Sequence, residues 1–301
     1  MTTPVLLLIH RRPAPTEQVF DAIRKARPPA LLVAADGPSD DPQCQETRNL
    51  VLLHVDWPCA VETRLLKENE GCKRAVAGAL DWAFSRHQHL IVIEDDCLPS
   101  ASFFPFCEEL LERYKDAPEV MQICGANLSD RAAEGGSDYY ASRFATIWGW
   151  ASWRRAWRHY DVAMRSWPEM RASPGWRKSC RFKGEARWRR RLYDEAHDGS
   201  VDTWDSAWMF ALQMQGGLSL IPSRNLVSNL GWGRDATHTH NVKDPRAAMP
   251  AESLHFPLRH PGSLLADDLA DRAYFERFCR QPSLMRRVFN KLRRLAARSP
   301  S

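Results

Sequence analysis

The segment LIVIEDD, residues 90–96, places the tightest constraint on the fold. Its four consecutive aliphatic residues predict a strand that is buried on both faces, as in a parallel sheet covered by helices. Three carboxylates, Glu94, Asp95 and Asp96, follow this strand without a break. Because the carboxyl ends of buried parallel strands open into a ligand-binding crevice, these acids predict a polar site at the end of the strand.

The first 127 residues alternate between strand patterns and helix patterns, which indicates an α/β fold with a Rossmann-like, mostly parallel sheet flanked by helices. Strands are predicted over residues 4–10, 30–36, 50–56, 90–94 and 120–127. Helices are predicted over residues 16–26, 67–86 and 100–117. A half rich in Trp and Arg follows, with one further strand pattern over 218–223. We expect a nucleotide-sugar-binding half (1–127), an acceptor and catalytic half of the same domain (128–265), and a basic helical tail (266–301).

Composition excludes several classes of protein. With 301 residues, 44% of them hydrophobic and 26% charged, the chain is typical of a globular protein. No apolar run is long enough to cross a bilayer, and the first one is too short for a secretory signal, so we expect a cytoplasmic location. Eight cysteines without a CxxC pair predict reduced, mostly buried thiols. The net charge of +5 is modest and clustered, which argues against nucleic-acid binding and for local anionic partners.

Three of the predicted strands end in polar residues that suit a nucleoside diphosphate. The first leads into Arg11 and Arg12, the second into Asp36, and the third into the acids of residues 94–96. An arginine can face a phosphate, a carboxylate can read a base or ribose edge, and an acidic cluster can bind Mn²⁺ or Mg²⁺ shared with the diphosphate. No GxxxxGK phosphate loop occurs. The alternative for the acids is a solvated turn at the strand end.

Five segments resemble, in consistent order, the GT-A fold glycosyltransferases over residues 4–240. VIEDDCLPSASFF resembles the DxD motif in the Glu-Asp-Asp form of N-acetylglucosaminyltransferase I-like enzymes. LLIHRRPAPTEQVFDAI resembles the nucleotide-binding strand and helix, VAADGP the base-reading turn, FATIWGWASWRRAW the segment before the acceptor half, and TWDSAWMFALQ the Trp-Asp motif of the catalytic base. The chain is also similar to bacterial sugar transferases that act on surface polysaccharides or lipid-linked glycans.

This resemblance implies roles for individual residues. Asp96 would be the direct metal ligand, and Asp95 and Glu94 would hold ribose or donor-sugar hydroxyls. Asp36 would face the base, and Arg12 or its neighbour Arg11 would lie near the diphosphate. Further candidates share a weaker match. Lys67 and Arg74 would face the diphosphate, and a solvated helix face explains them equally well. His238 would be a second metal ligand, although a lone histidine in a loop is more often simply solvated.

The motif DTWDSAWMF implies the catalytic base. Trp204 and Trp208 lie four residues apart and share a helix face, whereas Asp205 points elsewhere. As general base, Asp205 would deprotonate an acceptor hydroxyl that attacks the anomeric carbon with inversion. Asp202 is the runner-up, and a helix-start acid favoured by the helix dipole is the non-catalytic alternative.

Other segments support hypotheses of partners and motion. Trp148 and Trp150 could offer a ring to a sugar, while Trp153 and Trp157 fit the core. Residues 229–241 suit a lid, and the basic amphipathic pattern over 284–298 suits peripheral contact with the inner face of a membrane. The expected enzyme is therefore an inverting, metal-dependent glycosyltransferase using a UDP-sugar and a glycan or lipid-linked glycan. The alternatives are a sugar nucleotidyltransferase and a non-catalytic nucleotide-sugar-binding module.

Overall fold

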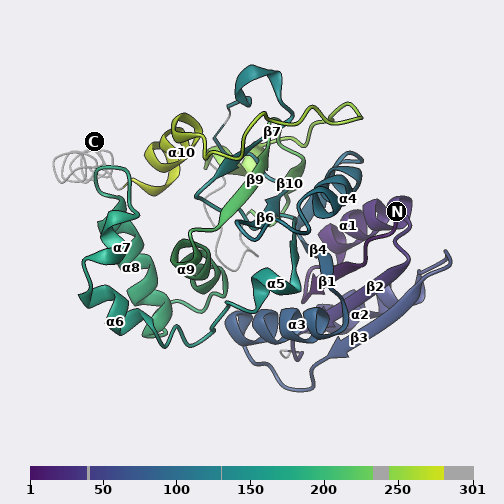
Figure 1. The fold of residues 1–301 in the computed structure, drawn as a ribbon. Helices are drawn as coiled ribbons and strands as arrows, with labels where there is room; N and C mark the ends of the chain where they lie inside the picture. The colour runs from purple at the N-terminus through teal and green to yellow at the C-terminus, as the bar shows by residue number, and fades with distance from the viewer. Residues whose placement is uncertain (39–40, 130, 233–243, 281–301) are drawn as a thin grey trace, which may run out of the picture.

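The computed structural model describes residues 1–38, 41–129, 131–232 and 244–280, and these ranges form a mixed α/β fold around an eight-stranded sheet (Figure 1). The strand order is β3-β2-β1-β4-β8-β6-β9-β7, and only β7 and β8 run against the other six described strands. The strands of this sheet are β1 (Val5–Ile9), β2 (Ala30–Ala35), β3 (Ala60–Leu65), β4 (His89–Glu94), β6 (Val120–Cys124), β7 (Tyr139–Ser142), β8 (Trp150–Trp153) and β9 (Leu218–Pro222). The predicted class, a mostly parallel sheet flanked by helices, is confirmed.

Helices cover both faces of the sheet because successive strand side chains point to opposite sides. On one face, residues such as Leu7 and Val33 pack under α1 (Pro13–Ala26), α2 (Gln43–Leu53) and α4 (Phe103–Arg113). On the other face, residues such as Leu6 and Val92 pack under α3 (Cys72–Arg86), α5 (Arg154–Trp157) and α9 (Asp205–Gln215). The strand β4 is fully buried from Leu90 to Ile93, as its aliphatic run predicts.

The second half adds a helical layer beyond the sheet. The helices α6 (Trp167–Ala172), α7 (Gly175–Lys178) and α8 (Glu185–His197) lie together on one side in Figure 1, and a cluster of buried aromatic rings joins them to α9. The helix α10 (Asp268–Tyr274) continues into a single π-turn over Phe275–Cys279, whose Phe275 packs on Phe144. A two-stranded pair of β5 (Cys97–Pro99) and β10 (Val227–Asn229) completes the strands.

Two sequence predictions of secondary structure are wrong. Residues 50–56, expected as a strand, form the end of α2 and the turn after it. The buried residues of α2, Cys44, Thr47, Arg48 and Val51, follow helical spacing, and a short apolar run does not distinguish a strand from a helix. The real third strand is β3, whose residues are mostly exposed. The second half also holds β7 and β8, where only one strand was expected.

The remaining fold-level expectations have mixed outcomes. All eight cysteines lie in the described ranges as free thiols, and five of them are buried. No helix among the described residues combines the length and the apolar character needed to cross a bilayer. The amphipathic pattern over 284–298 lies outside the described residues, as does most of the predicted lid.

Candidate functional site

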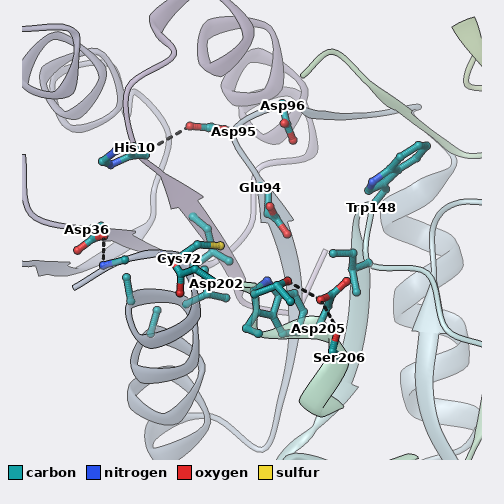
Figure 2. Close-up of a pocket in the computed structure, with 18 of the residues that line it drawn as sticks. His10, Asp36, Cys72, Glu94, Asp95, Asp96, Trp148, Asp202, Asp205 and Ser206 are labelled. Carbon is teal, nitrogen blue, oxygen red and sulfur yellow. Dashed lines mark hydrogen bonds between the residues drawn. The ribbon is translucent and has the colours of Figure 1, made fainter. Parts of the chain in front are cut away.

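A cavity of about 690 Å³ lies where β1, β2 and β4 end, opposite the start of α9 (Figure 2). His10, Asp36 and Glu94, from the ends of three different strands, all line it, so the predicted convergence of strand ends is confirmed. Asp205 lines the same cavity from the other half of the chain. The sheet therefore brings the candidate nucleotide residues and the candidate base into one space.

Arg12 and the acids after β4 form the charged centre of the cavity. Arg12 Nη1 donates a short hydrogen bond to Asp96 Oδ2 and lies 3.7 Å from Asp95 Oδ1. The backbone N–H of His10 donates to Asp95 Oδ2 at 3.0 Å. Burial alone would lower the pKa of Arg12, but Asp95 and Asp96 outweigh it and raise that pKa. Arg12 is therefore held as a cation between two carboxylates.

Glu94 is less well hydrogen-bonded than its neighbours Asp95 and Asp96. Its Oε1 is buried and has no hydrogen-bond partner among the described residues. Burial, followed by repulsion from Asp96 and Asp95, raises the pKa of Glu94 well above its usual range. Burial and the charge of Asp96 likewise raise the pKa of Asp95 to about 7. Three carboxylates share one close arginine, so this end of the cavity attracts positive charge.

Asp36 makes backbone contacts that the sequence does not reveal. Its Oδ1 accepts hydrogen bonds from the N–H groups of Gly37 at 2.7 Å and Glu70 at 2.8 Å, and its Oδ2 accepts from that of Gly71 at 3.0 Å. These bonds tie the end of β2 to the turn that enters α3. The base-reading role of Asp36 stays a prediction, and any nucleotide would meet a carboxylate that already has three donors.

Asp202, the runner-up for the catalytic base, caps α3 from 130 residues away. Its Oδ2 accepts from Cys72 N at 2.8 Å and its Oδ1 from Lys73 N at 3.1 Å. The residue at the helix start, Gly71, has no side chain that could satisfy these N–H groups. Asp202 therefore supplies the missing N-cap through a tertiary contact.

Asp205 has a different environment. It is the first residue of α9, and its Oδ1 accepts from the hydroxyl of Thr203 and, at 3.4 Å, from that of Ser206 (Figure 2). Trp204 and Trp208 point into the core and pack against Trp150, as their spacing predicts. Of the two candidate bases, Asp205 is the one that accepts hydrogen bonds from side-chain hydroxyl groups, whereas Asp202 accepts them from helix N–H groups.

The other tryptophan predictions separate cleanly. Trp148 lines the cavity and is half-buried. Trp150 is completely buried in β8, so the expectation that its ring could meet a sugar is wrong, because β8 inserts between β4 and β6 in the middle of the sheet. Trp153 and Trp157 are buried, as expected.

Of three further candidates, two do not line the cavity and one lies outside the described residues. Lys67 and Arg74 are exposed and do not line the cavity. His238 lies outside the described residues. Several cavity residues were missed, because nothing in their local sequence marks them individually as site residues: Arg64, Cys72, Glu195, Asn229, Arg246 and Tyr274.

Gly231 explains one short-range feature of the predicted lid. A Cβ atom at this position would collide with the carboxylate of Asp96 and press on Arg12. The neighbouring Leu230 N donates to the Asp96 backbone oxygen at 2.7 Å. The chain after β10 thus passes directly over the acidic end of β4, and a larger residue at position 231 would require the side chain of Asp96 to move.

The charge of the cavity is unbalanced. Its lining holds seven carboxylates and four arginines, and no lysine. Within the described ranges, no group of three His, Cys, Asp or Glu side chains could hold a metal ion by itself. The donor chemistry still suits a hard divalent cation, since Mg²⁺ commonly takes one or two carboxylates and completes its shell with water and substrate phosphates. The partnerless Oε1 of Glu94 is one such oxygen.

No known protein-family profile matches the sequence, and no curated protein matches it. Solved structures with a similar course of the chain include an active-site mutant of LgtC (11% identity, TM-score 0.34, 56% of this chain and 65% of that chain) and S. aureus TarS (7%, 0.43, 75% and 59%). UDP-glucose pyrophosphorylase complexed with UDP-glucose is another (10%, 0.32, 53% and 79%). This chain spans less than two thirds of the LgtC and TarS chains.

Proposed function

We propose that the protein is a glycosyltransferase that transfers a sugar from a nucleoside diphosphate, with UDP as the favoured nucleotide, to a hydroxyl group of a glycan or lipid-linked glycan. The observation that carries this proposal is a single cavity with excess carboxylates at the end of β4 and a separate carboxylate, Asp205, at the start of α9. The first group suits a cation-bound diphosphate, and the second suits an acceptor hydroxyl.

The charge imbalance is the argument for a bound cation. A diphosphate that entered a cavity with seven carboxylates and four arginines would meet net repulsion. Asp96 and Glu94 are the residues that would hold Mn²⁺ or Mg²⁺, with Arg12 as the neighbouring cation. When bound, such an ion offsets the negative charge that grows on the departing diphosphate.

The protein's own residues would then carry the proton and orient the reactants. Asp205 accepts the proton of the acceptor hydroxyl while the hydroxyl oxygen forms a bond to the anomeric carbon. The bond from that carbon to the diphosphate oxygen breaks, the electron pair leaves with the nucleoside diphosphate, and the anomeric configuration inverts. Arg12 and Trp148 both line the cavity; in this proposal Arg12 would face the departing oxygen and Trp148 would face the acceptor sugar.

The first test is a calorimetric titration with UDP-, GDP- and CMP-sugars, each with Mn²⁺ and with EDTA. We expect binding of the UDP-sugar in Mn²⁺ and a large loss in EDTA. Asp96→Asn should also abolish the Mn²⁺-dependent part of the affinity without unfolding the protein. Equal UDP affinity for the wild type with and without metal would refute the assignment of the acidic end.

Turnover separates the alternatives. A glycosyltransferase releases UDP from the UDP-sugar in the presence of an acceptor. A sugar nucleotidyltransferase instead releases pyrophosphate from a nucleoside triphosphate and a sugar 1-phosphate, and a binding module releases neither. Release of pyrophosphate, or binding without any release, would therefore overturn the proposal.

A further inference from the structure

The two edge strands of the sheet, β7 and β3, differ in whether another part of the described chain covers them. At the β7 edge, Ala141 bridges to Ala266, and Asp138 N donates to Arg259 O, so the segment 259–267 covers that strand. At the opposite edge lies β3, and Figure 1 shows it as the outermost strand. No other described strand pairs with its outer side.

The backbone of β3 offers three residues to this open edge. Ala60 N donates to Pro29 O and Leu66 N to Ala35 O, so these residues turn their polar groups toward β2. Alternate residues of a strand in a parallel pair point their N–H and C=O groups to opposite sides. Val61, Thr63 and Leu65 therefore direct both groups away from the sheet.

Side chains on the same strand are also exposed. Val61 is 43% exposed and Leu65 is 36% exposed. These are two of the six large hydrophobic residues that the described chain exposes. Natural edge strands are usually blunted by charged side chains, proline or a bulge. Residues 61–65 carry no proline and no bulge, and their two charged residues, Glu62 and Arg64, have opposite signs.

The sequence of β3 is complementary to itself when it runs antiparallel to a second copy. With Thr63 opposite Thr63 on a twofold axis, Val61 faces Leu65 and Glu62 faces Arg64. The three outward-facing residues then fall at hydrogen-bonded pairs, while the charged pair falls between them. Opposite charges and apolar pairs that face each other across strands stabilise a sheet.

Glu62 can take part in such a pair while it keeps its partners within the chain. Its two carboxylate oxygens lie 3.0 Å from Arg86 Nε and 3.1 Å from His87 Nε2. A carboxylate offers about four acceptor sites, so Arg64 of a second copy can bind as well once its guanidinium turns from Gly78 of α3, beside the cavity, toward the edge.

We propose that two copies of this chain associate through β3, antiparallel and centred on Thr63, to form one continuous sheet across a twofold axis. The interface is isologous, because each copy presents the same strand to the other. Main-chain hydrogen bonds of Val61, Thr63 and Leu65 supply the adhesion, and the Glu62–Arg64 pairs set the register.

Sedimentation equilibrium of the full chain tests this proposal through a charge-reversal cycle. The wild type should reach twice the chain mass as its concentration rises. Glu62→Arg and Arg64→Glu should each raise the dimer dissociation constant by about tenfold, because each places like charges opposite one another at both symmetric pairs. The double variant Glu62→Arg/Arg64→Glu should restore the wild-type value. Glu62→Arg and the double variant lose the same contact with Arg86, so the loss of that contact cannot explain a difference between them.

Two further variants guard the interpretation. Thr63→Pro removes an N–H group that points outward, so it should leave the ladder with β2 intact and abolish the dimer. Leu269→Lys, at a residue 51% exposed and away from β3, should change nothing. A wild-type chain that stays at single mass, or a double variant that folds and does not recover, overturns the proposal. A variant truncated after Arg280 that dimerises while the full chain does not would also overturn the proposal, because the residues after Arg280 would then block the edge in the full chain.

Discussion

Two of the buried charge clusters in the described ranges, one in α8 and one at the end of β4, differ in how completely the protein satisfies their arginine and carboxylate groups. In the first, Glu185 and Arg189 of α8 each expose 3% of the side chain. Glu185 Oε2 accepts from Arg181 N at 2.7 Å, and its Oε1 accepts from Arg189 Nε at 2.8 Å. Arg189 Nη1 then donates to the hydroxyl of Tyr193, which donates to Gln213. Every member of this chain of bonds has a partner.

The second cluster, at the end of β4, lacks such closure. Arg12 is shared by Asp95 and Asp96, and Glu94 keeps an oxygen without a partner among the described residues. A buried charge without compensation costs free energy unless something neutralises it. The comparison teaches that the α8 cluster is complete within the chain, whereas the β4 cluster suits an external cation and its ligand.

The largest expected effect concerns the base opposite the β4 cluster. Asp205→Asn should lower the rate of sugar transfer by about a hundredfold to ten-thousandfold, the range of general-base catalysis. The dissociation constant of the donor should change little, because in the proposed mechanism Asp205 contacts the acceptor and not the donor. Steady-state kinetics together with donor titration would measure both.

Asp202→Asn is the matched control for that measurement. It keeps an oxygen that can cap α3 and should retain most of the transfer activity. A normal rate for Asp205→Asn together with a lost rate for Asp202→Asn would exchange the two assignments. Normal rates for both would contradict the mechanism.

The next effect tests the comparison directly through stability. Glu185→Gln leaves Arg189 buried without its counter-charge and should cost about 3–5 kcal/mol of the free energy of unfolding. Asp96→Asn removes one of three mutually repelling carboxylates and should leave the free energy of unfolding unchanged or raise it. Urea unfolding of both variants would measure the contrast. Similar losses in the two would show that the β4 acids serve the fold rather than a ligand.

The contrast also shows how much the sequence could reveal. The aliphatic run of β4 and the polar ends of β1 and β2 predict where the cavity lies, because parallel strands end at the same edge of a sheet. Asp205 was placed by resemblance to a motif, and the structure brings it to that cavity. These features depend on local pattern and on topology.

The features that the sequence does not predict depend on contacts between residues far apart in the chain. The cap that Asp202 gives to α3 joins residues 130 positions apart, which no local pattern encodes. The strand β8 has only four residues, too few for its alternation to stand out, and the exposed β3 lacks the apolar signal of a buried strand. Completeness of a charge cluster, such as that of Glu185, is likewise a tertiary property.

A third buried carboxylate, Asp271, lies between the two extremes and gives a pH dependence. It accepts hydrogen bonds from Ser142 and Arg143, yet burial raises its pKa from an ordinary 3.8 to about 6. The folded state then binds a proton more tightly than the unfolded state, so the contribution to stability falls as the pH rises from about 4 to about 6. Across this window, the wild type should lose up to about 3 kcal/mol relative to Asp271→Asn, which cannot ionise. A constant difference in unfolding free energy between pH 4 and pH 7 would contradict this assignment.

The smallest expected effect distinguishes a cavity carboxylate that stabilises the fold from the carboxylates that we propose to bind a ligand. Asp202 lines the cavity, but both of its carboxylate oxygens accept hydrogen bonds from the N–H groups of Cys72 and Lys73. Asp202→Ala should therefore lower the free energy of unfolding by about 1 kcal/mol, the usual cost of losing an N-cap. Asp202→Asn should lose much less, because asparagine caps helices nearly as well as aspartate. Chemical denaturation of the two variants beside Asp205→Ala would measure the difference, and Asp205→Ala should leave α3 capped. If Asp202→Ala were as stable as the wild type, the two backbone bonds would not account for its position, and Asp202 would join the acids that face a ligand.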